Sequence, residues 1–180
     1  MKIVNPATGA VVGEVADTTP AEVAAAFTAA RAAQPRWAAV PLADRIEVLR
    51  KFRAGVVYRL ADLAATLTEE TGKPISQSTG ELKGLLPRID FFLDHAEAAL
   101  ADSVELDDPE SGLLEVISHE PLGVVANISA WNYPWFVGSN VFVPALLAGN
   151  AVLYKPSEFA LNTGLAIGEL LWSAGVPREV

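Results

Sequence analysis

The pattern of apolar and charged positions changes at residue 121. Up to residue 120 the apolar residues are interspersed with charges, whereas residues 121–154 form a block of 34 residues without Asp, Glu, Lys, Arg or His. At the start, two β-prone pairs at 3–4 and 11–12 flank the turn-forming sequence Pro6-Ala7-Thr8-Gly9. This pattern predicts a short β-hairpin.

A helix start follows the predicted hairpin. Thr19 offers a capping hydroxyl, Pro20 occupies the first helical position and Glu22 stands in the reciprocal capping place. We expect this helix to run to about Ala33 and to stop before Pro35, because proline lacks the N–H that a helix interior uses.

The next segment carries an apolar stripe with helical spacing. Arg45, like the other arginines of the segment, falls outside the stripe, and Gly72 and Pro74 should end the helical region. Glu69 and Glu70 are most simply an acidic helix end in solvent. The stripe residues lie three or four positions apart and are Leu42, Ile46, Leu49, Phe52, Val56, Leu60, Leu63 and Leu67.

A third helix is predicted over residues 75–100, and Pro87 should kink or interrupt it. Two β-prone runs follow, at 104–106 and 113–118, on either side of a turn sequence rich in Asp, Pro and Gly.

The uncharged block and the residues after it repeat one order of elements. Residues 123–129 and 151–154 are predicted to be buried strands. Residues 136–147 and 161–174 suit helices, although Pro144 disturbs the first of them. Strand, helix, strand, helix predicts an α/β fold with a parallel sheet.

A membrane hairpin is the alternative for this block. Strands of a parallel sheet are continuous apolar runs because both faces are covered, whereas a spanning helix needs about 20 uninterrupted apolar residues. Several asparagines, together with Pro134 and Pro144, interrupt the block. These interruptions favour the sheet.

Composition excludes several classes of function. The 180 residues include 13 basic and 22 acidic side chains, and a net charge of −9 argues against a nucleic-acid partner. The chain has no cysteine, so it contains no disulfide, thiolate metal site or cysteine nucleophile. No signal peptide is visible at the start, and we expect a cytoplasmic protein.

Candidate chemistry lies where the two predicted strands end, since ligands of open α/β sheets bind beyond the carboxyl ends of the strands. Lys155 and Glu158 follow the second strand. A carboxylate there can accept hydrogen bonds from ribose hydroxyls, and a lysine beside it can donate to the ribose or face a phosphate. Equally, both residues can simply mark the return of the chain to solvent.

Asn132 lies in the loop after the first strand, between the aromatic residues Trp131 and Tyr133. Its amide can donate a hydrogen bond to a developing oxyanion. The alternative is an ordinary turn or helix-capping asparagine.

Several well-known motifs are absent from the chain. It has no G-x-G-x-x-G, no P-loop and no cluster of metal ligands, so a standard Rossmann enzyme is not supported. His95 and His119 are far apart in the sequence and lack paired partners, which indicates surface or helix-end positions.

Six blocks of sequence follow one another in order and at coherent spacing. They are NPATGAVVGEV at 5–15, ADRIEVLRKF at 43–52, EETGKPISQSTGE at 69–81, HEPLGVVANIS at 119–129, SAWNYPW at 129–135 and GNAVLYKPSE at 149–158. Together these blocks resemble the aldehyde dehydrogenase superfamily, and the resemblance spans essentially the whole chain.

This resemblance implies a fold and an activity. The fold would be a hairpin and helices (1–103), a β arm of the oligomerisation type (104–119) and the first β-α-β-α of an incomplete, Rossmann-like NAD-binding sheet (120–180). The activity would be NAD(P)-dependent oxidation of an aldehyde to a carboxylic acid, in which a cysteine attacks the aldehyde and a glutamate-activated water releases the acid.

The resemblance also implies roles for individual residues. Asn132 would be the oxyanion-hole amide, and Glu158 would repel a 2′-phosphate, so NAD is the expected cofactor and NADP remains possible. Lys155 and Glu158 would bind the adenosine ribose, on a loop shaped by Pro156 and Ser157. The residues that would line the nicotinamide side of the cofactor are Ile128, Ser129, Ala130 and Trp131.

Members of the family are much longer than this chain, which holds neither the nucleophilic cysteine nor the glutamate base. We therefore expect the N-terminal part of an enzyme that acts on a small-molecule aldehyde and forms a homo-oligomer when complete, without a nucleic-acid or membrane partner. The alternative is a catalytically inactive fragment that serves as a binding or assembly module.

Overall fold

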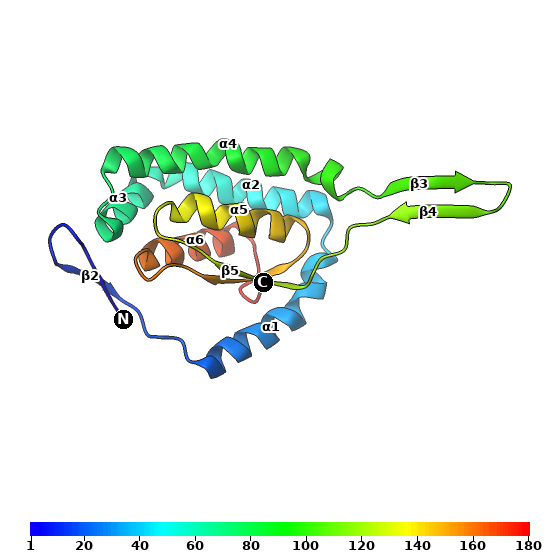
Figure 1. Cartoon of the computed structure of the whole chain (residues 1–180). Helices are drawn as coiled ribbons and strands as arrows, with labels where there is room; N and C mark the ends of the chain where they lie inside the picture. Colours follow the sequence, from blue (N-terminus) through cyan, green and yellow to red (C-terminus); the bar gives the residue numbers. More distant parts are fainter.

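The computed structural model describes residues 1–180 as helices packed around a small parallel sheet, with two hairpins extending from this body (Figure 1). The helices are α1 (Pro20–Ala38), α2 (Leu42–Tyr58), α3 (Leu60–Thr71), α4 (Ile75–Leu100), α5 (Pro134–Leu147) and α6 (Leu161–Ala174). The strands are β1 (Lys2–Val4), β2 (Val11–Glu14), β3 (Ser103–Asp108), β4 (Leu113–Ile117), β5 (Val124–Ile128) and β6 (Ala151–Lys155).

The N-terminal predictions of a hairpin and a capped helix are confirmed. Strands β1 and β2 pair antiparallel around a turn that contains Gly9 at φ +74°. At the start of α1 the backbone N–H of Glu22 donates to the Thr19 hydroxyl over 3.3 Å, and the Thr19 N–H donates to the Glu22 carboxylate over 2.7 Å. This reciprocal pair satisfies two of the backbone N–H groups at the helix start.

The predicted end of α1 is wrong, because the helix continues through Pro35 to Ala38. Proline removes one backbone hydrogen bond, but tertiary contacts hold the last turn in place. Gln34 donates to the carbonyl of Gly149 over 2.9 Å, and the buried indole of Trp37 donates to the carbonyl of Leu146 over 3.0 Å.

The apolar stripe of the next segment is confirmed, although it extends over two helices that break at Arg59. Leu42 and Leu60 are partly buried and pack against the core, and the remaining stripe residues are all buried. The predicted end is also confirmed, since Gly72 caps α3 at φ +73°, a conformation that suits glycine.

The sequence placed Arg45 outside the apolar stripe, but the structure buries this residue. Its guanidinium donates to the carbonyl of Leu147 over 3.0 Å and to that of Ala38 over 2.9 Å. Arg45 therefore joins α2 to the ends of α1 and α5, because free carbonyls at helix ends accept such donors.

Helix α4 runs past Pro87 without interruption, and β3 and β4 pair antiparallel around the predicted turn. Figure 1 shows this hairpin reaching away from the body of the chain. Its apolar side chains are exposed, among them Val104, Leu114 and Ile117.

The predicted parallel sheet is confirmed. Strands β5 and β6 pair in parallel, in a register that runs from Val124 opposite Ala151 to Ile128 opposite Lys155. Strand β5 is not buried on both faces as predicted. Asn127 faces α5 and donates to the carbonyl of Gly138 over 3.0 Å, whereas the next residue, Ile128, points to the other side of the strand and is 78% exposed.

The core lies between the sheet and helices α2 to α6. Phe52 of α2 meets Phe142 of α5 edge to face, with ring centroids 5.8 Å apart. The uncharged block thus folds as β5, α5 and β6. None of the helices combines the length and apolar character needed to cross a membrane.

Candidate functional site

The parallel pairing of β5 and β6 brings both predicted site segments to one edge of the sheet. Ile128 stands opposite Lys155, and one residue further on the Ser129 N–H donates to the Lys155 carbonyl over 3.0 Å. The loop after β5 therefore begins next to the loop that carries Glu158.

Lys155 and Glu158 form an exposed pair at this edge. The Lys155 Nζ lies 3.3 Å from Oε2 of Glu158, and the two side chains are 61% and 50% exposed. A hydrogen bond from its own backbone N–H, followed by the hydrogen bond and charge of Lys155, lowers the pKa of Glu158. The site thus offers a negative acceptor beside a cationic donor, a combination suited to a ligand with hydroxyl groups.

The loop between these two residues is tightly packed. The Ser157 side chain is buried, and its hydroxyl accepts a hydrogen bond from the Phe159 N–H over 3.3 Å. Pro156 lies directly on α6 at Gly164, where an added Cβ would come within 2.5 Å of the proline ring. Only a residue without a side chain allows this approach, so Gly164 helps to set the position of the loop.

A groove of about 590 Å³ lies beside the Lys155–Glu158 loop, between α6 and the segment that follows β2. Its walls are mainly apolar and include Val15, Tyr154, Pro156, Leu165 and Trp172. The groove adjoins the edge of β6 that faces away from β5, where the Val152 N–H donates to the carbonyl of Val180 over 2.7 Å.

Asn132 lies exposed in the loop between β5 and α5, and its side-chain amide makes no hydrogen bond within the chain. The helix-capping alternative is wrong, since α5 begins after Tyr133 and receives its cap from another element. Next to Asn132, the exposed ring of Trp131 meets Phe159 edge to face at 5.8 Å, and Ala130 is half-buried. The amide is therefore available to a ligand.

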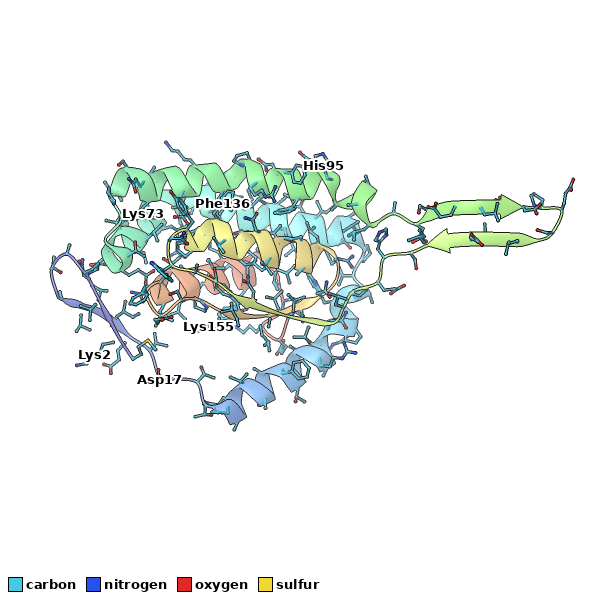
Figure 2. The ribbon with its side chains drawn as sticks, viewed as in Figure 1. Lys2, Asp17, Lys73, His95, Phe136 and Lys155 are labelled. Atoms are coloured by element: carbon cyan, nitrogen blue, oxygen red, sulfur yellow. The ribbon has the colours of Figure 1, made fainter.

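Two residues that the sequence analysis missed hold this loop. Glu81 of α4 accepts a hydrogen bond from the Trp135 N–H over 2.9 Å and so caps α5. Lys73, in the turn between α3 and α4, contacts the Glu81 carboxylate and donates to the Asn132 carbonyl over 2.6 Å. Figure 2 shows Lys73 near the start of α5, which bears Phe136.

A third missed residue is Glu70, whose predicted place in solvent is wrong. It is buried and caps α6, accepting hydrogen bonds from the N–H groups of Asn162 over 2.8 Å and Thr163 over 2.7 Å. Burial raises the pKa of Glu70, and the hydrogen bonds from Thr163 and Asn162 oppose that shift only in part.

The helical spacing in the sequence could have indicated that both carboxylates lie on buried helix faces. Glu70 stands three positions after Leu67 on the apolar stripe of α3, and Glu81 stands four positions before the buried Leu85 on α4. A carboxylate on a buried face requires partners, and a helix N-terminus supplies them.

The two histidines lie outside this site. His95 is exposed on α4 (Figure 2), with its ring stacked 4.4 Å from that of Phe91. His119 is exposed after β4. Their predicted surface positions are confirmed.

Comparison with known proteins identifies the family. Lactaldehyde dehydrogenase of Escherichia coli K12 is 34% identical over 178 residues, which cover 99% of this chain and 37% of that protein. The NADP-dependent glyceraldehyde-3-phosphate dehydrogenase of Bacillus halodurans, solved with NADP, superposes with a TM-score of 0.92 at 28% identity, over 99% of this chain and 38% of that one. A Sinorhizobium meliloti structure solved with NAD gives a TM-score of 0.91 at 32% identity, over 99% of this chain and 36% of that one.

The chain therefore spans little more than a third of the length of the relatives it matches. The model of the aldehyde dehydrogenase family matches residues 1–180, and the chain belongs to that family.

Proposed function

We propose that this chain is the N-terminal part of an NAD(P)-dependent aldehyde dehydrogenase that oxidises an aldehyde to a carboxylic acid. The observation that carries the proposal is the shared edge of β5 and β6, where Ser129 donates to the Lys155 carbonyl over 3.0 Å. This contact places the loop of Asn132 beside the Lys155–Glu158 pair, so that one edge offers a neutral amide donor and an acceptor for hydroxyl groups.

The donor set at this edge fits the adenosine half of a nicotinamide cofactor. Glu158 and Lys155 would bind the ribose hydroxyls, Pro156 and Ser157 would hold that loop in place, and the neighbouring apolar groove would take the adenine ring. The negative Glu158 favours NAD over NADP, because a 2′-phosphate would approach a carboxylate.

The loop after β5 would serve the reacting end of the cofactor, which accepts a hydride when bound. Ile128, Ser129, Ala130 and Trp131 would line the nicotinamide side. Asn132 would donate its side-chain N–H to the oxyanion that forms when a nucleophile attacks the aldehyde carbonyl. The nucleophile itself must come from another segment, because the chain contains no cysteine.

We assign the remaining parts by the same reasoning. Residues 1–103 form the hairpin and helical part, residues 104–119 an arm for contact with another subunit, and residues 120–180 the start of the cofactor sheet. The exposed apolar side chains of the β3–β4 hairpin support its role in a homo-oligomer. A cytoplasmic location and a small-molecule aldehyde substrate belong to the same proposal.

The test is to express the protein encoded by the full reading frame that contains this chain, here called the complete enzyme, and to measure NADH formation with a panel of aldehydes. We expect aldehyde-dependent reduction of NAD by the complete enzyme and none by residues 1–180 alone. A frame without a cysteine-bearing segment, or no rate with any aldehyde, would support the inactive binding module instead.

A further inference from the structure

A buried ion pair lies behind the loop that carries Asn132. The Lys73 ammonium contacts Oε2 of Glu81, and their side chains are only 11% and 0% exposed. Lys73 comes from the turn between α3 and α4, and Glu81 from the second turn of α4. Neither element belongs to the cofactor sheet, so the pair links the helical part of the chain to it.

Both members of the pair also bind the loop between β5 and α5. The Lys73 Nζ donates to the backbone carbonyl of Asn132 over 2.6 Å and lies 4.1 Å from the centroid of the Tyr133 ring. The second carboxylate oxygen of Glu81 accepts from the N–H groups of Trp135 over 2.9 Å and Phe136 over 3.4 Å. The segment from Asn132 to Phe136 is therefore held on both sides of Pro134.

The need for an external cap follows from the local sequence. The residue that precedes α5 is Tyr133, whose side chain makes no capping hydrogen bond, and Pro134 has no N–H to satisfy. Glu81 supplies the missing acceptor and places a negative charge at the positive end of the helix dipole. Lys73 then neutralises a carboxylate that would otherwise be buried without a counter-charge.

Stability alone does not account for a charged pair at this position. A buried ion pair generally contributes little more than an apolar pair of the same volume, because both charges lose their hydration. The ammonium and the carboxylate instead fix the positions of the backbone groups that they bind, since charge-assisted hydrogen bonds are short and directional. The geometry fixed here is that of the backbone at Asn132, whose side chain makes no hydrogen bond within the chain that would orient it.

We propose that Lys73 and Glu81 are positioning residues, which set the backbone at Asn132 and thereby aim its amide at the oxyanion. This inference rests on the proposed function of Asn132. It adds that the catalytic geometry of the cofactor sheet is determined partly by the turn between α3 and α4.

A second ion pair on α4 provides a control. Arg53 of α2 and Asp90 of α4 form a two-pronged ion pair at 2.5 and 2.8 Å, which likewise joins two elements but makes no hydrogen bond to the Asn132 loop. Their side chains are more exposed, at 32% and 40%. Asp90→Asn thus removes a charge from an ion pair on the same helix that does not hold the loop.

The test compares five variants of the complete enzyme, one of which is Asn132→Ala alone. Glu81→Gln keeps an acceptor for the Trp135 N–H and loses the charge, and the double variant Lys73→Met/Glu81→Gln leaves no unpaired buried charge if the single variant fails to fold. Asp90→Asn is the control. The triple variant Lys73→Met/Glu81→Gln/Asn132→Ala shows whether the pair acts through Asn132.

Hydrogen exchange of the peptide that contains residues 131–136 reports on the loop, and kcat and the KM for the cofactor report on the reaction. We expect the double variant to exchange about tenfold faster in this peptide and to lose about tenfold in kcat, the effect of one charge-assisted hydrogen bond, with the cofactor KM nearly unchanged. Asp90→Asn should change neither quantity. In the Asn132→Ala background, loss of the pair should lower kcat no further.

Unchanged exchange in residues 131–136 would overturn the inference, as would a further tenfold loss of kcat in the Asn132→Ala background. A failure of the proposed function would look different. In that case Asn132→Ala alone would leave kcat unchanged, while faster exchange in the double variant would still assign the loop's position to Lys73 and Glu81.

Discussion

The carboxylate of Glu70 on α3 accepts a hydrogen bond of 2.7 Å from the backbone N–H of Thr163 in the first turn of α6. A second bond, from the Asn162 N–H, completes the cap. Glu70 thus occupies the place at a helix N-terminus where many α/β proteins bind a phosphate group. The corresponding place on α5 is occupied by Glu81. Internal carboxylates therefore cap both helices that follow the strands of the parallel sheet, and the chain lacks the glycine-rich phosphate motif.

Glu70 should make stability depend on pH in a defined direction. Burial raises its pKa in the folded chain above the ordinary value of 4.5, so below that value its contribution to stability is fully present. As the pH rises through the raised pKa, the buried carboxylate ionises and stability is lost. Glu70→Gln cannot ionise, so the difference in unfolding free energy between this variant and the wild-type chain should shift in favour of the variant as the pH rises above 4.5.

Urea unfolding at a series of pH values measures this difference, and Glu69→Gln, at the exposed neighbouring position, controls for the loss of one negative charge. A shift in favour of the wild-type chain with rising pH would mean that the hydrogen bonds from Asn162 and Thr163 outweigh the cost of burial.

Asn132→Ala should lower kcat of the complete enzyme about 10² to 10³-fold, the usual effect of removing one oxyanion donor. Its side chain is exposed and makes no hydrogen bond within the chain, so the free energy of unfolding should change by less than about 0.5 kcal/mol. Single-turnover kinetics isolates the chemical step. An unchanged rate of that step would leave Asn132 as an ordinary turn residue.

Glu158→Gln should weaken the binding of NAD more than that of NADP. The carboxylate is the stronger acceptor for ribose hydroxyls, and we expect about a tenfold loss of NAD affinity without it. The loss for NADP should be smaller, because the substitution also relieves repulsion of the 2′-phosphate. Titration of both cofactors measures this, with Glu169→Gln as a control that removes an exposed carboxylate on α6, outside the loop of Glu158. Equal losses for the two cofactors would argue against a ribose role.

Local signals predicted the parts of the fold that depend on neighbouring residues. The Thr19–Glu22 capping box and the left-handed glycine caps at Gly72 and Gly175 are determined within one turn of chain, so their positions were predictable. The apolar stripes and the strand-helix-strand order were predictable for the same reason. The order then places both candidate loops at one sheet edge, since parallel strands end on the same side.

The features that sequence reasoning missed depend on partners far along the chain. Pro35 sits inside α1 because Trp37 bonds to a carbonyl 109 positions away, a contact that no local propensity predicts. Glu70 and Glu81 cap helices whose N–H groups lie 93 and 54 positions away. Their place on a buried stripe indicated that partners were needed, but the identity of those partners follows only from the packing of α3 and α4 against the sheet.

Two glycines one turn apart on α6 should respond in opposite ways to alanine. At Gly164 an added Cβ would come within 2.5 Å of the Pro156 ring, so either the helix or the Lys155–Glu158 loop must move. We expect Gly164→Ala to destabilise the chain by about 1–3 kcal/mol, as overpacking usually does. Because the displaced loop carries Lys155 and Glu158, the pair proposed to bind the ribose, NAD affinity should fall as well.

Gly168→Ala is the matched control. Its Cβ would lie 3.4 Å from the Trp172 ring, an ordinary contact, and alanine favours the helix by as much as about 1 kcal/mol relative to glycine. This variant should be as stable as the parent chain or more stable, with unchanged NAD affinity. Urea unfolding and cofactor titration of both variants separate the two effects. If Gly164→Ala loses stability while NAD binding stays the same, the contact between Pro156 and α6 serves packing only, and the position of the Lys155–Glu158 loop does not depend on it.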